Sequence, residues 1–333
     1  IQTNAGEGSS ISDQDYIAAG AQIMPDAPST WNNADMVLKV KEPIASEYQY
    51  LRPGLLLFTF LHLAADPELT KELLAKEVTA IAYETVQTPN RQLPLLAPMS
   101  EVAGRLSVLV GAQSLFAQNG GHGILLGGVP GTRSAKVAIL GGGVAGTNAI
   151  AMAVGLGADV TVLDTNINRL RELDSIYHGR LKTLASNSFE IDRAVSQADL
   201  VIGSVLIPGA KAPKLVTNAL VKKMKPGSVL VDIAIDQGGC FEDSKPTTHA
   251  EPTFKVHQSI FYCVANMPGA VAHTSTYALT NATLSYAKAL ANKGWLEACK
   301  ADHSLALGLN THAGKLVNQP VAEAHSLPYS DLD

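Results

Sequence analysis

Apolar runs alternate with amphipathic stretches throughout the second part of the chain, from residue 136 onward. The predicted strands span 137–140, 160–163, 181–184, 200–203, 228–232 and 260–264. The predicted helices span 144–156, 167–177, 188–197 and 215–223. Strands that alternate with helices in this way are typical of a doubly wound parallel sheet, so the pattern predicts a Rossmann-type α/β domain.

The first part of the chain shows the same alternation in a less regular form. Apolar runs predict strands at 36–40, 55–60 and 78–83, with a helix over 67–75. Pro94 and Pro98 then interrupt the chain, and Ser100 stands at the N-cap position of a long helix predicted over 102–116. Further helices are predicted over 277–291 and 295–299, and we expect them to pack on the first part of the chain.

A glycine-rich turn follows the first strand of the predicted sheet. Residues 141–146 read Gly-Gly-Gly-Val-Ala-Gly, which fits the pattern GxGxxG. Gly141 permits a tight turn, Gly143 lets the backbone approach a pyrophosphate, and Gly146 lets the next helix pack on the strand. The pyrophosphate would bind the N-terminal amides of that helix. The turn therefore predicts a dinucleotide site, with a fortuitous glycine-rich loop as the alternative.

An acidic residue at the end of the next strand favours one dinucleotide over another. Asp164 follows the run 160–163, close to the usual spacing of about 20 residues from the glycines. Its carboxylate can accept hydrogen bonds from a ribose hydroxyl and would repel a phosphate. The sequence therefore predicts NAD rather than NADP.

Composition narrows the class of protein. A chain of 333 residues is long enough for two domains. With 46% hydrophobic residues and a net charge of −5, it is typical of a soluble globular protein that binds neither nucleic acid nor membrane. Three cysteines without a CxxC pair favour a reducing, cytoplasmic location. No spacing typical of a metal site occurs in the sequence, so no metal is expected.

Several residues could supply acid–base chemistry. His62 ends an apolar run, where an imidazole could act as a base near neutral pH or be a satisfied core histidine. Lys39 and Lys41 are two residues apart in a predicted strand, which places both on one face, directed at a cleft or at water. Asp236 follows a buried strand and precedes two glycines, so it faces the cofactor crevice or is an ordinary turn aspartate.

Several segments together resemble a known family: 38–43, 58–65, 81–87, 98–105, 203–215 and 231–240. They resemble the alanine dehydrogenase and transhydrogenase α-subunit family, and within it the L-alanine dehydrogenases, from Ile1 to about Tyr329. The resemblance implies an NAD-dependent enzyme that reversibly converts L-alanine to pyruvate and ammonium by hydride transfer from the substrate α-carbon.

The resemblance also implies roles for individual residues. His62 would be the catalytic acid and base, Lys41 would bind the substrate carboxylate or carbonyl oxygen, and Asp236 would order ammonia or water and the histidine. The implied NAD contacts are Ser100, Gly141, Gly143, Val144, Ala145, Gly146, Asp164, Arg169, Ser186, Val205, Leu206, Ile233, Val264, Asn266 and Met267.

The resulting expectation is a discontinuous substrate domain of residues 1–95 and 272–333 and an NAD-binding domain of residues 96–271 that includes a connecting helix. Relatives form homohexamers, so the resemblance implies a homo-oligomer. The family also carries an N-terminal strand with a carboxylate-binding arginine that would precede Ile1. Without that strand, one alternative is a dinucleotide-binding protein with little or no turnover. A separate alternative is a transhydrogenase-like subunit.

Overall fold

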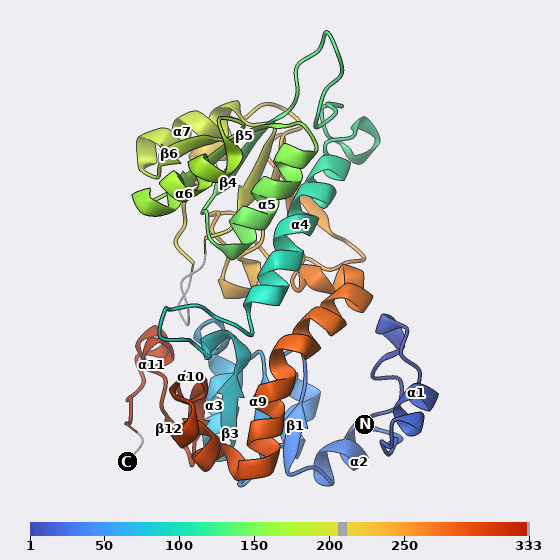
Figure 1. Cartoon of the computed structure of the whole chain (residues 1–333). Helices are drawn as coiled ribbons and strands as arrows, with labels where there is room; N and C mark the ends of the chain where they lie inside the picture. Colours follow the sequence, from blue (N-terminus) through green and yellow to red (C-terminus); the bar gives the residue numbers. More distant parts are fainter. Residues whose placement is uncertain (206–211, 332–333) are drawn as a thin grey trace. The chain divides into compact units, whose positions relative to one another are not determined.

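The computed structural model describes residues 1–205 and 212–331. These residues form two compact units, whose elements are labelled in Figure 1. Among the described residues, unit 1 consists of 1–98 and 271–331, and unit 2 consists of 99–205 and 212–270. No helix in the described part of the chain combines the length and the hydropathy needed to cross a bilayer.

Unit 2 is built on one seven-stranded sheet. Its strands are β4 (Lys136–Leu140), β5 (Asp159–Asp164), β6 (Lys182–Ala185), β7 (Leu200–Gly203), β8 (Val229–Asp232), β9 (Thr253–Val256) and β10 (Ser259–Tyr262). They lie in the order β6-β5-β4-β7-β8-β10-β9, and only β9 is antiparallel to its neighbour. The strand order reverses between β4 and β7, which is where doubly wound sheets bind ligands.

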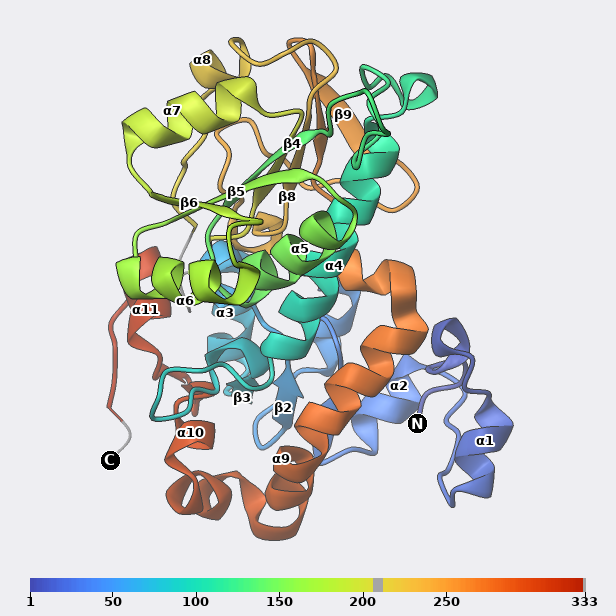
Figure 2. The same ribbon diagram turned by 45° about the horizontal axis from the view of Figure 1, so that its top comes forward.

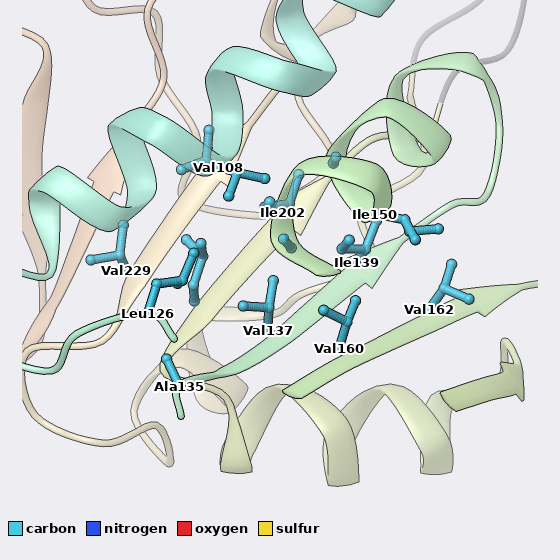
Figure 3. Close-up of a cluster of buried hydrophobic side chains, with 14 of the residues drawn as sticks. Val108, Leu126, Ala135, Val137, Ile139, Ile150, Val160, Val162, Ile202 and Val229 are labelled. Carbon is cyan, nitrogen blue, oxygen red and sulfur yellow. The ribbon is translucent and has the colours of Figure 1, made fainter. Parts of the chain in front are cut away.

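Helices cover both faces of this sheet (Figure 2). The helices are α4 (Ala97–Ser114), α5 (Val144–Gly155) and α6 (Ile167–Tyr177) on one face, and α7 (Ser188–Gln197) and α8 (Asn218–Val221) on the other. Figure 3 shows Val137, Ile139 and Val160 of the strands packed beneath Val108 of α4 and Ile150 of α5. The alternate residues Ala138 and Leu140 pack on the opposite face, so both faces of the sheet are buried.

Unit 1 contains a smaller mixed sheet. Its strands are β1 (Met36–Leu38), β2 (Leu56–Thr59), β3 (Thr79–Ala82), β11 (Leu309–His312) and β12 (Lys315–Leu316), hydrogen-bonded in that order. The first three are parallel, and β11 and β12 continue the sheet antiparallel. The surrounding helices are α1 (Asp13–Ala18), α2 (Ala27–Asn32), α3 (Pro67–Ala75), α9 (Ala272–Ala301), α10 (His303–Ala306) and α11 (Gln319–His325). Side chains from α2, α3 and α11 form the core with the strands.

The predicted fold class, a Rossmann-type parallel sheet plus a second α/β domain, is confirmed. Several details of the prediction were wrong, and the unit 1 strands β11 and β12 were missed. The edge strand β9 was missed because its residues are only partly buried and give no apolar run. The helix predicted over 215–223 is reduced to α8. Ser100 does not cap α4 but lies within it, because the helix begins at Ala97 and tolerates Pro98 in its first turn.

The two helices predicted over 277–291 and 295–299 both lie within one helical element, α9. A single residue in this element departs from helical geometry. Gly294 has φ 74° and ψ 163°, a combination that is open mainly to glycine. The glycine therefore separates two helical stretches, and this is where the sequence pattern also divides.

Candidate functional site

The glycine turn links β4 to α5 at the reversal of strand order in unit 2. Gly141 has φ 100°, and a Cβ on Gly146 would lie 1.9 Å from the Gly141 carbonyl oxygen, so α5 packs directly against the turn. A Cβ on Gly143 would meet no heavy atom of the described residues within 4 Å. Gly143 is also the N-cap and has no side chain to bind the first amides of α5. These features fit the pyrophosphate of a dinucleotide, which needs open access to unsatisfied helical amides.

Asp164 and Arg169 flank this turn. The two carboxylate oxygens of Asp164 accept hydrogen bonds from the amides of Gly142 and Asn166, each at 2.7 Å. Each oxygen retains acceptor capacity for a ribose hydroxyl. Arg169 Nε donates to the Gly142 carbonyl oxygen at 2.7 Å, so Arg169 braces the turn directly. The backbone amide of Ser186 donates to the Asp164 carbonyl oxygen at 2.9 Å, which places Ser186 beside Asp164.

Other predicted cofactor residues follow strands at the same carboxyl edge. Val205 lies beside Gly141, and the Ile233 amide donates to the Gly203 carbonyl oxygen at 2.9 Å. Val264 and Met267 are buried in the core of unit 2. Leu206 lies outside the described residues.

Ser100 and Ala145 are brought near this edge by the packing of two helices. Ser100 lies in the first turn of α4, and Ala145 lies in the first turn of α5. A Cβ on Gly104 of α4 would lie 2.2 Å from the Ala145 carbonyl oxygen, so the two helices approach closely. This contact fixes the start of α5, where the turn presents its amides.

Asp236 lies in a 3₁₀ helix, Ile235–Gln237, immediately after β8. Its Oδ2 accepts a hydrogen bond from the Asn266 amide at 3.3 Å, which brings together two predicted site residues that follow different strands. Beneath this loop, the buried Asp232 accepts hydrogen bonds from the amides of Ala234 at 3.0 Å and Cys240 at 2.9 Å. Burial raises the pKa of Asp232. Asp232 therefore fixes both ends of the loop that carries Asp236.

In unit 1, His62 lies just beyond β2. Its imidazole stacks on Phe60, with ring centroids 5.7 Å apart and an interplanar angle of 17°. Its Nδ1 lies 3.2 Å from Glu42 Oε2. The imidazole is only 14% exposed, so these neighbours largely fix its orientation.

Lys41 and Glu42 complete a charged cluster around His62. Lys41 Nζ lies 3.4 Å from Glu42 Oε1. Burial raises the pKa of Glu42, but the hydrogen bond with His62 and the charge of Lys41 outweigh burial and lower that pKa to about 2. Glu42 is therefore ionised near neutral pH. Lys39 binds Glu47 instead, with Nζ 2.5 Å from Oε1, so the two lysines that were expected on one face belong to different ion pairs.

Sequence reasoning did not assign roles to Glu42 and Glu84, both of which contact His62. Glu84 comes two residues after the buried strand β3 and is itself only 4% exposed. An acidic residue at the end of a largely apolar strand was a usable signal, because carboxylates are rarely buried without a partner. Among the described residues, no group of three or more His, Cys, Asp or Glu side chains could hold a metal ion.

The doubly wound sheet, the open glycine turn and Asp164 define a dinucleotide-binding α/β protein. Family models agree with this class and narrow it. The model described as "Alanine dehydrogenase/PNT, N-terminal domain" matches residues 1–103, and its C-terminal counterpart matches residues 107–319. The chain belongs to the alanine dehydrogenase/PNT family.

Individual relatives cover almost the whole chain. It is 61% identical over 331 residues to the alanine dehydrogenase of Mycolicibacterium smegmatis. The aligned region covers 99% of this chain and 89% of the relative. The chain is 58% identical over 334 residues to alanine dehydrogenase 2 of Staphylococcus aureus, covering 100% and 90%.

Two solved structures give the same result. A structure of an L-alanine dehydrogenase superposes with a TM-score of 0.89 at 54% identity and covers 98% of this chain and 90% of that one. A transhydrogenase of Sinorhizobium meliloti superposes with a TM-score of 0.77 at 26% identity, covering 95% and 90%.

Proposed function

We propose that this chain is an NAD-dependent alanine dehydrogenase. The reaction converts L-alanine, NAD⁺ and water to pyruvate, ammonium, NADH and a proton, and it is reversible. The observation that carries the proposal is the 61% identity to an alanine dehydrogenase over 99% of the chain. The identity to the transhydrogenase is only 26%, which favours the dehydrogenase over the transhydrogenase-like alternative.

Bound NAD would accept a hydride from the substrate α-carbon. The amides at the start of α5 would bind its pyrophosphate, since Gly143 leaves them open. Asp164 would accept hydrogen bonds from ribose hydroxyls and repel a 2′-phosphate. The further contacts expected from the sequence, from Ser100 to Met267, remain proposals.

His62 would transfer the protons of the reaction. Hydride leaves the α-carbon readily only after the amine is deprotonated, so a base must stand beside the amine. Glu42 contacts Nδ1 of His62, and we assign proton transfer with the substrate to this imidazole. The ionised Glu42 would orient the ring and stabilise its protonated form.

Lys41 and Asp236 would act on the substrate's other groups. Lys41 would bind the substrate carboxylate or carbonyl oxygen, because its ammonium attracts developing negative charge. Asp236 would order the ammonia or water consumed in the two directions of the reaction. Both assignments follow the family resemblance. The positive charge of Lys41 would face the substrate oxygen atoms, and the negative charge of Asp236 would face the N–H or O–H donors of ammonia or water.

We assign residues 1–95 and 272–333 to a substrate domain and residues 96–271 to an NAD-binding domain. We also assign the chain to a homo-oligomer, a hexamer by family resemblance, and to the cytoplasm. Light scattering of the purified chain tests the oligomer directly, since a monomer would contradict it.

Turnover tests the function. We expect NADH formation with L-alanine, followed at 340 nm, and a rate at least about a hundredfold lower in His62→Ala, because general acid–base catalysis contributes roughly that factor or more. The control is His303→Ala, which removes an exposed histidine of unit 1 and should leave the rate unchanged. NADH binding without turnover of alanine would instead identify a dinucleotide-binding protein.

A further inference from the structure

The backbone of His62 is held in an unfavourable conformation. Its φ of 51° and ψ of 35° lie in the left-handed region. Residues other than glycine disfavour this region because Cβ approaches the following carbonyl oxygen. Such a conformation persists only where the surroundings impose it. Since the Cα–Cβ bond follows the backbone, the groups that fix this turn also fix the position of the imidazole.

A buried carboxylate fixes the turn. Glu84 lies in the 3₁₀ helix Tyr83–Thr85, directly after β3, and its Oε1 accepts hydrogen bonds from the amides of His62 at 2.6 Å and Leu61 at 3.1 Å. Its Oε2 also lies within hydrogen-bond distance of the Leu61 amide, at 3.3 Å. Both amides lie beyond the last residue of β2, where strand pairing no longer satisfies them. Hydrogen bonds from amides to a charged acceptor are among the strongest in proteins.

The imidazole makes its contacts with Phe60 and Glu42 only in this position. One face stacks on Phe60, and Nδ1 meets Glu42. Relaxation of His62 to a right-handed or extended backbone would swing the ring away from both.

We propose that Glu84 is a positioning residue for catalysis. Its carboxylate binds the Leu61 and His62 amides, holds His62 in the left-handed conformation and so directs the imidazole toward the substrate. The inference rests on the proposed function, in which His62 is the catalytic base. Glu84 itself touches neither substrate nor cofactor in this proposal.

Kinetics of Glu84→Gln test the proposal. The amide keeps one acceptor oxygen but loses the charge and turns an N–H toward the two donors. We expect kcat for L-alanine to fall by between about ten- and a hundredfold, as for a base displaced by about 1 Å, with KM for NAD unchanged. In a His62→Ala background, Glu84→Gln should reduce the residual rate by less than about twofold, because the two residues act as one unit. An equal loss in both backgrounds, or a wild-type rate in the single variant, would overturn the proposal.

A neighbouring residue provides the matched control. The Thr85 hydroxyl is also buried and contacts the Gly308 carbonyl oxygen and Asn310 Nδ2 rather than the 61–62 turn. Thr85→Val should lower the thermal midpoint but keep kcat. If Glu84→Gln does not fold, Glu84→Asp replaces it, since its shorter side chain keeps the charge but cannot reach both amides. We expect the same loss, again absent with His62→Ala, and a wild-type rate would overturn the proposal.

A crystal structure separates this proposal from the proposed function. In Glu84→Gln we expect φ of His62 to leave the positive region and the stacking on Phe60 to be lost. A wild-type chain that does not oxidise alanine would refute the proposed function, yet the crystallographic comparison would still decide the role of Glu84. An unchanged His62 in the variant would overturn the positioning role.

Discussion

At the scale of single residues, the chemistry of unit 1 depends on charges that are partly removed from water. Glu42 shows most clearly how burial and neighbouring charges oppose each other in setting a pKa. Burial alone would favour its protonated form, but His62 and Lys41 lie within 3.4 Å and keep it ionised. Because the interaction is reciprocal, the carboxylate that His62 helps to ionise also stabilises the protonated imidazole. Glu42 therefore influences the pH range over which His62 is a base.

We expect Glu42→Gln to change the pH profile as well as the rate. Loss of the negative charge removes the stabilisation of protonated His62, so the acidic limb of kcat/KM for L-alanine should move to lower pH. Loss of orientation should reduce the maximal rate about tenfold or more. Initial rates measured between pH 5 and 9 check both effects. An acidic limb that stays in place would contradict the His62–Glu42 pairing, whatever happens to the rate.

At the scale of elements, glycines determine how α5 meets the sheet. Gly141 adopts the positive φ that the turn needs, Gly146 allows close packing, and Gly143 leaves the helix N-terminus open. The GxGxxG pattern predicts all three roles, because each depends on local backbone geometry. Gly294 in α9 has an equally local cause, since a positive φ separates two helical stretches of one element.

Alanine substitutions at two glycines of this turn should have different effects. Gly146→Ala places a methyl group 1.9 Å from a backbone oxygen, so it should lower both the thermal midpoint and the NAD affinity. Gly143→Ala meets no described atom, so it should keep the midpoint and reduce NAD affinity about tenfold or more by blocking the pyrophosphate.

Gly155→Ala, at the exposed end of the same helix, is the control. Its Cβ also meets no described atom, so it should keep NAD affinity and stabilise the chain by about 0.5 kcal/mol or more. Calorimetric titration with NADH and thermal unfolding measure both quantities. Undiminished NADH affinity in Gly143→Ala would contradict the assigned pyrophosphate site.

At the scale of the whole molecule, the buried Asp199 ties together the starts of three strands of unit 2 through its carboxylate and its backbone carbonyl oxygen. Asp199 precedes β7 and accepts hydrogen bonds from Arg133 at 2.7 Å, Lys225 at 2.8 Å and the Lys136 amide at 2.7 Å. The Val229 amide, at the start of β8, donates to the Asp199 carbonyl oxygen at 3.0 Å. Burial raises the pKa of Asp199, but these hydrogen bonds outweigh burial and lower it from 3.8 to about 2.

This lowered pKa predicts how stability changes in acid. A carboxyl group with a depressed folded pKa stabilises the fold fully above its unfolded pKa, and the stabilisation is lost as pH falls from about 4 to about 2. At about 1.4 kcal/mol for each pKa unit, Asp199 contributes about 2 kcal/mol near neutral pH. Asp199→Asn should therefore lower the thermal midpoint by several degrees at pH 7 and by progressively less toward pH 2.

An exposed pair provides the control for this prediction. Lys223 Nζ lies 2.6 Å from Asp192 Oδ2, and both side chains are largely exposed. Asp192→Asn should cost less than about 1 kcal/mol, because water screens exposed ion pairs. Thermal unfolding of the two variants between pH 2 and 7 compares them directly. An equal decrease in thermal midpoint in both variants would show that the buried Asp199 contributes no more stability than an exposed ion pair.

Periodicity predicted the fold class and most strands, because apolar alternation records which faces of an element are buried. It failed at β9, whose partly exposed residues form an edge strand only because β10 offers a hydrogen-bonding partner. It also misplaced the start of α4, since Pro98 is compatible with the first turn of a helix as well as with its interruption.

By itself, the sequence determined the features that depend on local geometry and on residue type: the glycine turn, Asp164 at the end of the next strand, and His62 as a candidate base. The role of Glu84 was decided only by tertiary structure. Glu84 is 22 residues from His62 along the chain, and only the parallel pairing of β2 with β3 brings its carboxylate to the His62 amide. A hydrogen bond between distant residues leaves no period or spacing in the sequence, because its partners are selected by strand pairing.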